Sequence, residues 1–136
     1  MDIKKIDHLG IVVSDLEEGI CLFRDGLKLP YLRTEDLPDW NIRIAFFQCG
    51  EVLLELIEPV GPCDGLTFLQ NQGGGLHHIA FEVEDIHDAF EKARGAFETK
   101  TSAPVIGAGN SEIFFLQEKT ILNMQTEFVE LKKGGK

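Results

Sequence analysis

The chain has 136 residues, 43% of them hydrophobic, which is enough for one compact domain with its own core. Its 13 basic residues face 23 acidic residues, and the resulting formal charge of −10 opposes binding to nucleic acid or anionic lipid. No apolar stretch approaches membrane-spanning length and the N-terminus lacks a signal-peptide pattern, so we expect a cytoplasmic protein. Three cysteines without metal-site spacing suit reduced, buried thiols. Small molecules and protein partners are the ligand classes left open.

The first predicted elements are a strand over IDHLGIVV, residues 6–13, and a helix over LEEGICLFRDGL, residues 16–27. Ser14 and Glu17 match a capping box at the start of this helix. Leu16, Ile20 and Phe23 share one helical stripe. An amphipathic helix of this kind is expected to cover one face of a sheet.

The same pattern returns 70 residues later, in LHHIAFEVEDI followed by IHDAFEKARGAF. Further strands correspond as well: residues 43–48 match 112–117 at an offset of 69, and LLELIEP from Leu53 matches FVELKKG from Phe128 at an offset of 75. Each half is therefore predicted to be β-α-β-β-β. We expect a single domain over 1–136, with module 1 at about 4–58, a linker at 59–74 and module 2 at about 75–132. The linker is predicted to hold one short helical turn near Leu66 to Gln70, and Lys132 to Lys136 to form a frayed tail.

Strand alternation separates the adjacent histidines of LHHIAFEV. Neighbouring residues of a strand point to opposite faces, so His78 lies opposite the helix-covered face, while His77 points toward the helix side. His8 holds the matching position in the first strand. The small residues Gly10 and Ala80 follow on the same faces and leave room in front of the sheet.

Two carboxylates complete the pattern. Glu55 and Glu130 lie between apolar residues in the last predicted strand of each half, where a charged, unpaired side chain would be destabilising by several kcal/mol. His8, Glu55, His78 and Glu130 thus occur as one histidine and one carboxylate per repeat, and a pseudo-twofold axis would bring all four together. Two imidazoles and two carboxylates suit a divalent Zn, Co, Ni, Mn or Fe ion.

The whole pattern resembles the vicinal-oxygen-chelate superfamily of glyoxalases, bleomycin-resistance proteins and dioxygenases. Within it, DHLGIVVSDLEEGI, EDLPDWNIRIAFFQCGEVLLELIEP, FLQNQGGGLHHIAFEVEDI and GAGNSEIFFL are similar to segments of the methylmalonyl-CoA epimerase family. The resemblance implies an α+β fold in which two β-α-β-β-β modules form a half-open barrel around one divalent metal ion, Co, Zn, Ni or Mn. It implies His8, His78 and Glu130 as metal ligands, with Glu55 at the fourth position, and a homodimer.

The resemblance also implies a reaction. An epimerase of a 2-carboxy acyl-CoA removes the proton between two carbonyl groups and returns one to the opposite face, through a metal-stabilised enediolate. Glu130 is the implied first base. Asp39, in the turn Pro38-Asp39-Trp40-Asn41, takes the place of the second family carboxylate. Asp39 is one methylene shorter than the glutamate usual in the family, and Trp40 beside it is bulky.

Three other functions use the same fold. A glyoxalase I-type lyase would use the same four ligand positions on a thiol hemithioacetal. An extradiol dioxygenase would hold iron with two histidines and one glutamate, and Glu55 argues against it because a fourth ligand would occupy space needed by oxygen. A metal-free binding protein of this fold is disfavoured by the presence of all four ligand types.

Overall fold

The computed structural model describes residues 1–132, so the expected tail after Lys132 lies outside the described residues. The chain divides into two compact units. The first unit is His8–His77, and the second unit combines Met1–Asp7 with the chain from His78 onward. Among the described residues, no helix is long and apolar enough to cross a membrane.

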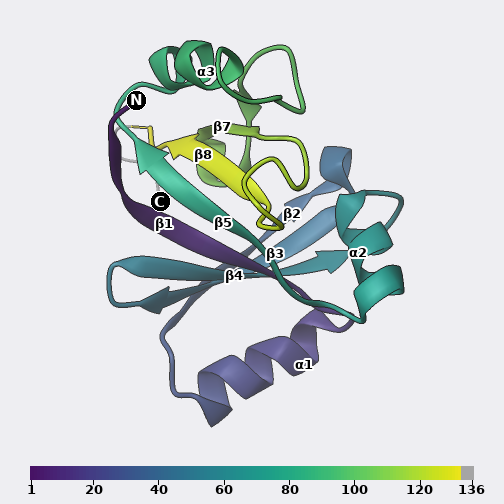
Figure 1. Ribbon diagram of the computed structural model, residues 1–136. Coiled ribbons are helices and arrows are strands. Elements are labelled where there is room, and N and C mark those ends of the chain that lie inside the picture. Colours follow the sequence, from purple (N-terminus) through teal and green to yellow (C-terminus); the bar gives the residue numbers. More distant parts are fainter. Residues whose placement is uncertain (133–136) are drawn as a thin grey trace. The chain divides into compact units, whose positions relative to one another are not determined.

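The first unit contains the predicted β-α-β-β-β sequence (Figure 1). Its part of the sheet has the strand order β2-β3-β4-β1, with β1 and β4 parallel. The elements are β1 (Ile3–Val12), whose first residues belong to the second unit, α1 (Leu16–Ile20) with a π-helical continuation (Cys21–Gly26), β2 (Tyr31–Leu37), a 3-10 turn (Pro38–Trp40), β3 (Ile42–Cys49), β4 (Val52–Pro59) and α2 (Asp64–Gln72).

The second unit repeats this sequence of elements. Its strand order is β1-β5-β8-β7-β6, and β5 and β8 are parallel, as β1 and β4 are in the first unit. The elements are β5 (Gly75–Val83), whose first residues belong to the first unit, α3 (Ile86–Arg94), β6 (Val105–Ile106), a 3-10 turn (Ala108–Asn110), β7 (Glu112–Phe115) and β8 (Thr126–Glu130).

Each unit packs its helix on one face of its own strands. In the first unit, Leu16 and Ile20 of α1 are buried with Leu56 of β4. In the second unit, Phe90 of α3 meets Phe114 of β7 edge to face at 5.1 Å. Alternation along the strands therefore turns the other face of each unit, which carries the histidines, away from its helix.

Three local predictions differ from the structure. The N-cap of α1 is Asp15, whose side chain accepts a hydrogen bond from the Glu18 amide at 3.1 Å, so Ser14 does not form the expected capping box. The helical turn predicted near Leu66 to Gln70 is present, but it is longer than expected, since α2 has 9 residues. Cys21 and Cys49 are exposed, although all three cysteines are free thiols.

Candidate metal centre

The first unit contains a buried histidine–carboxylate pair. Glu55 of β4 lies opposite Gly10 of β1, and the missing side chain at Gly10 leaves space beside it. His8 precedes Gly10 by two residues and therefore points to the same face. The Nδ1 atom of His8 lies 3.2 Å from Oε2 of Glu55, and these side chains are only 5% and 4% exposed.

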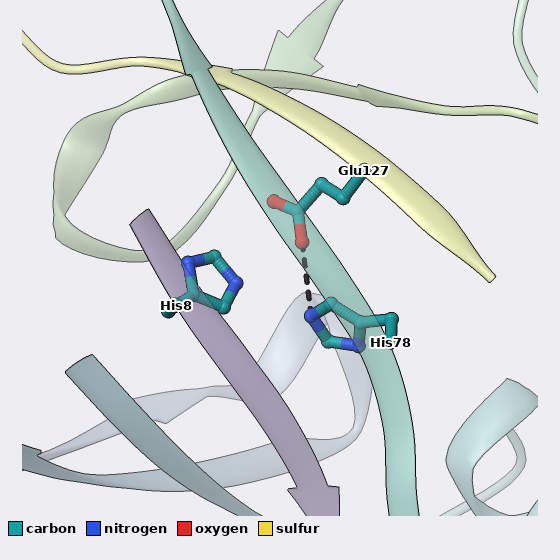
Figure 2. Close-up of side chains that lie close together, drawn as sticks. All are labelled: His8, His78 and Glu127. Carbon is teal, nitrogen blue, oxygen red and sulfur yellow. Dashed lines mark ion pairs between the residues drawn. The ribbon is translucent and has the colours of Figure 1, made fainter. Parts of the chain in front are cut away.

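The second unit contains an equivalent pair, between His78 of β5 and Glu127 of β8 (Figure 2). Nε2 of His78 lies 3.0 Å from Oε1 of Glu127, and both side chains are 5% exposed. Glu127 lies opposite Ala80, the position that corresponds to Gly10. A carboxylate buried this deeply requires a cationic, metal or hydrogen-bonding partner.

The strand registers show that Glu127, and not Glu130, corresponds to Glu55. Glu55 faces Gly10 and Phe46, while Glu127 faces Ala80 and Phe115. The offset between the last strands is thus 72 residues, and the predicted offset of 75 is wrong. The structure brings His8 to Glu55 and His78 to Glu127, and it does not bring Glu130 to His78.

Glu130 instead contacts the start of a helix. Its Oε1 accepts a hydrogen bond from the Ile86 amide at 2.8 Å, at the first residue of α3. In the first unit, Oε2 of Glu58 accepts one from the Leu16 amide at 3.0 Å, at the first residue of α1. Both carboxylates therefore satisfy an amide that a helix leaves unpaired.

A sequence signal for Glu127 existed. Glu55-Leu56-Ile57-Glu58 and Glu127-Phe128-Val129-Glu130 share the pattern E-apolar-apolar-E. Residues three apart in a strand lie on opposite faces, so one glutamate can meet the histidine while the other reaches the helix. The expected offset of 75 aligns Glu130 with Glu55, whereas the complete pattern aligns Glu127 with Glu55 and Glu130 with Glu58.

The candidate second base, Asp39, is exposed in the 3-10 turn Pro38–Trp40. The turn ends at Asn41, whose φ of 58° is in the left-handed region that asparagine tolerates. Within β3, Phe46 is the neighbour of Glu55 and lies four residues after Ile42. At ordinary strand rise these four residues span about 13 Å. The structure therefore places Asp39 at the strand end and not beside the His8–Glu55 pair.

His77 has the structural position predicted for it. Its ring meets Phe68 of α2 edge to face at 4.9 Å, within the first unit. His78 instead meets Phe115 edge to face at 5.3 Å, within the second unit. Strand alternation thus assigns one histidine of the doublet to a helix contact and the other to a buried carboxylate.

Comparison with known proteins agrees with this architecture. The model of the glyoxalase/bleomycin resistance protein/dioxygenase superfamily matches residues 7–115. The chain belongs to this superfamily. The predicted α+β vicinal-oxygen-chelate fold is confirmed by methylmalonyl-CoA epimerase from Mycobacterium tuberculosis, at a TM-score of 0.92 and 25% identity over 97% of this chain and 91% of that one.

Two further relatives bear on the chemistry. The chain is 33% identical to the ethylmalonyl-CoA/methylmalonyl-CoA epimerase of Cereibacter sphaeroides, over 86% of this chain and 90% of that protein. A methylmalonyl-CoA epimerase solved in complex with methylmalonyl-CoA and NH4+ has a TM-score of 0.88 and 28% identity, and the match covers 95% of each chain. The chain thus resembles epimerases of acyl-CoA within its superfamily.

Proposed function

We propose that the protein is a metal-dependent epimerase of a small 2-carboxy acyl-CoA, similar to methylmalonyl-CoA epimerase. The observation that carries the proposal is the occurrence of two buried His–Glu pairs at equivalent positions of two repeated units, each on the face away from its helix. The similarity to epimerases of acyl-CoA supports the same substrate class.

The proposed ligands of one divalent ion are His8, Glu55, His78 and Glu127. Glu127 replaces Glu130 because the register makes it the partner of His78. His8, His78 and Glu127, the three side chains of Figure 2, each offer one ligand atom. Imidazole nitrogen and carboxylate oxygen suit Co, Zn, Ni or Mn, so the donor set fits the ion that the superfamily implies.

The bound ion would act as a Lewis acid that stabilises negative charge on the substrate's carboxylate and thioester oxygens. The chain must supply the proton transfers. Glu127 is our candidate for the first base, since its carboxylate belongs to the His78–Glu127 pair, beside which the substrate would bind. Asp39 stays our candidate for the second base. The exposed turn that carries it would have to bring the Asp39 carboxylate to the opposite face of the substrate's C2 carbon.

The test is exchange of the substrate proton. Purified protein with added metal salt should exchange the C2 hydrogen of racemic methylmalonyl-CoA for deuterium in deuterated water, followed by NMR or mass spectrometry. Metal-stripped protein is the matched control and should show the uncatalysed rate. Metal-loaded protein that exchanges no faster than this control would exclude methylmalonyl-CoA as substrate.

A glyoxalase I-type lyase is the second candidate, because both units supply a His–carboxylate pair, as that enzyme type requires. Formation of a thioester from methylglyoxal and glutathione or bacillithiol would separate it from the epimerase. The expected homodimer and cytoplasmic location stay predictions.

A further inference from the structure

A cation lies beyond each candidate carboxylate, on the same face of the strands. In the first unit, Glu55 of β4 is opposite Phe46 of β3, and Phe46 is opposite Arg33 of β2. The guanidinium carbon of Arg33 lies 4.1 Å from the centre of the Phe46 ring. Two strand spacings separate Arg33 from Glu55 at the backbone, about 10 Å.

The second unit repeats this row with a lysine. Glu127 of β8 is opposite Phe115 of β7, and the Lys100 amide donates a hydrogen bond to the Phe115 carbonyl at 2.9 Å. Nζ of Lys100 lies 5.6 Å from the centre of the Phe115 ring. Both units therefore place carboxylate, phenyl ring and cation in the same order.

Arg33 is held in place but can accept a further anion. Its Nε and Nη2 atoms donate to the same oxygen of Glu35, at 3.0 and 2.7 Å. A guanidinium has five N–H donors, so this contact uses two and leaves three for another acceptor. The Arg33 side chain is 35% exposed and can be reached from solvent.

Lys100 likewise has a hydrogen-bonded backbone and an ion pair with an exposed glutamate. Its Nζ lies 3.6 Å from Oε1 of Glu118, a side chain that is 58% exposed, while Lys100 itself is 20% exposed. An ion pair this long, with one exposed partner, is weak. A ligand anion can therefore compete with Glu118 for Lys100.

The negative charge of the protein makes these two cations important for binding an anionic substrate. A chain with a formal charge of −10 repels an anionic thioester, and two of the four proposed metal-binding side chains are themselves carboxylates. Each ring excludes water from one side of its cation, and a charge attracts an anion more strongly where the surroundings are less polar. In the second unit the Phe115 ring is only half-buried, so it is also a suitable surface for an apolar acyl or pantetheine segment.

We propose that Arg33 and Lys100 each bind an anionic oxygen of the substrate beside the His–Glu pair of their own unit, and so determine its class. This inference rests on the proposed function, because it places the substrate at the His–Glu pairs. The ligand chemistry is an anionic oxygen, which an acyl-CoA can supply as the acyl carboxylate or as a phosphate of the CoA.

The test measures dissociation constants by calorimetry on the metal-loaded protein and its variants Arg33→Gln and Lys100→Gln. Each variant should bind methylmalonyl-CoA about tenfold more weakly or worse, as expected for loss of one charge-assisted hydrogen bond. Arg24→Gln and Lys92→Gln are matched controls, since each removes one charge from an exposed ion pair, with Asp25 and Asp88 respectively. Both controls should bind as the wild type does.

Two further ligands identify the source of the anion. Propionyl-CoA has the phosphates but no acyl carboxylate, and methylmalonyl-pantetheine has the carboxylate but no phosphates of CoA. Loss of affinity confined to propionyl-CoA and methylmalonyl-CoA would assign the cations to phosphate; loss with methylmalonyl-pantetheine would assign them to the carboxylate. Unchanged affinity for all three ligands in both folded variants would overturn the proposal.

Charge-retaining variants guard against unfolding. Arg33→Lys and Lys100→Arg should bind methylmalonyl-CoA more tightly than the corresponding glutamine variants, and equal affinity would contradict anion binding. The outcome is also separable from that of the proposed function. Loss of affinity in the variants of a protein that does not exchange the C2 hydrogen would support the binding role and contradict the epimerase; exchange with unaltered affinities would do the reverse.

Discussion

Glu127 and Glu130 are three residues apart and have different roles in this account. Glu127→Gln should lower the bound metal per chain, because it removes a proposed ligand from the His78 pair. Glu130→Gln should leave the metal bound and lower the free energy of unfolding by about 1 kcal/mol, the size of a lost helix-capping carboxylate. Elemental analysis and urea unfolding of both variants measure the two effects. Metal loss from Glu130→Gln equal to that from Glu127→Gln would restore the assignment made from sequence.

His77 offers a second test at this scale, because it neighbours a proposed ligand in sequence but faces the other way. His77→Ala should lower the free energy of unfolding by about 1 kcal/mol through loss of the ring contact with Phe68, with unaltered metal content. His78→Ala is the paired variant and should lose the metal. The reverse pattern would show that the strand register is wrong.

Part of the candidate site could be predicted from sequence for a physical reason. Strand alternation and the repeat suffice to place His8, His78 and Glu55 on faces away from the helices, and the structure agrees. The fourth position could not be placed the same way, because the segment before β8 differs in length between the repeats. A three-residue shift then exchanged the two faces of the strand, and only the pairing of β5 with β8 resolves it.

Among the elements, the helix starts show the same limit. Acidic residues before both helices indicated where they begin, and Asp85 does cap α3, accepting hydrogen bonds from the His87 and Asp88 amides. Before α1, Ser14 and Asp15 are both good caps, and propensity alone does not choose between adjacent candidates. The chain geometry at Asp15 decides, with an extended backbone at φ −139°.

The cap of α1 can be tested directly. Asp15→Ala should lower the free energy of unfolding by about 1 kcal/mol, because the Glu18 amide loses its acceptor. Ser14→Ala is the matched control and should change it much less. Chemical unfolding of the two variants provides the comparison, and a larger effect at Ser14 would reinstate the capping box.

The E-apolar-apolar-E pattern links elements within each unit. Glu58 joins β4 to the start of α1, and Glu130 joins β8 to the start of α3. Arg43 adds to the first of these, since it lies 3.6 Å from Glu58 and donates a 2.9 Å hydrogen bond to Asp36, which raises the pKa of the guanidinium. The strand that carries each proposed carboxylate ligand is thereby fixed to the helix behind it.

For the whole molecule, the repeat is the feature that unites fold and proposed chemistry. Each unit supplies a histidine, and it places a carboxylate, a phenyl ring and a cation in the same order across its neighbouring strands. Neither unit alone supplies more than two of the four proposed ligands. If one ion uses ligands of both units, metal binding should therefore depend on each of the four proposed ligands.

Metal titration of the stripped protein tests this claim most directly. Wild-type protein should bind one Co or Zn ion per chain, and His8→Ala and His78→Ala should each abolish tight binding, because each removes a ligand of the same ion. Isothermal titration with elemental analysis gives stoichiometry and affinity. Two ions per chain in the wild type, with one retained in each variant, would show two separate His–Glu sites and contradict a shared centre.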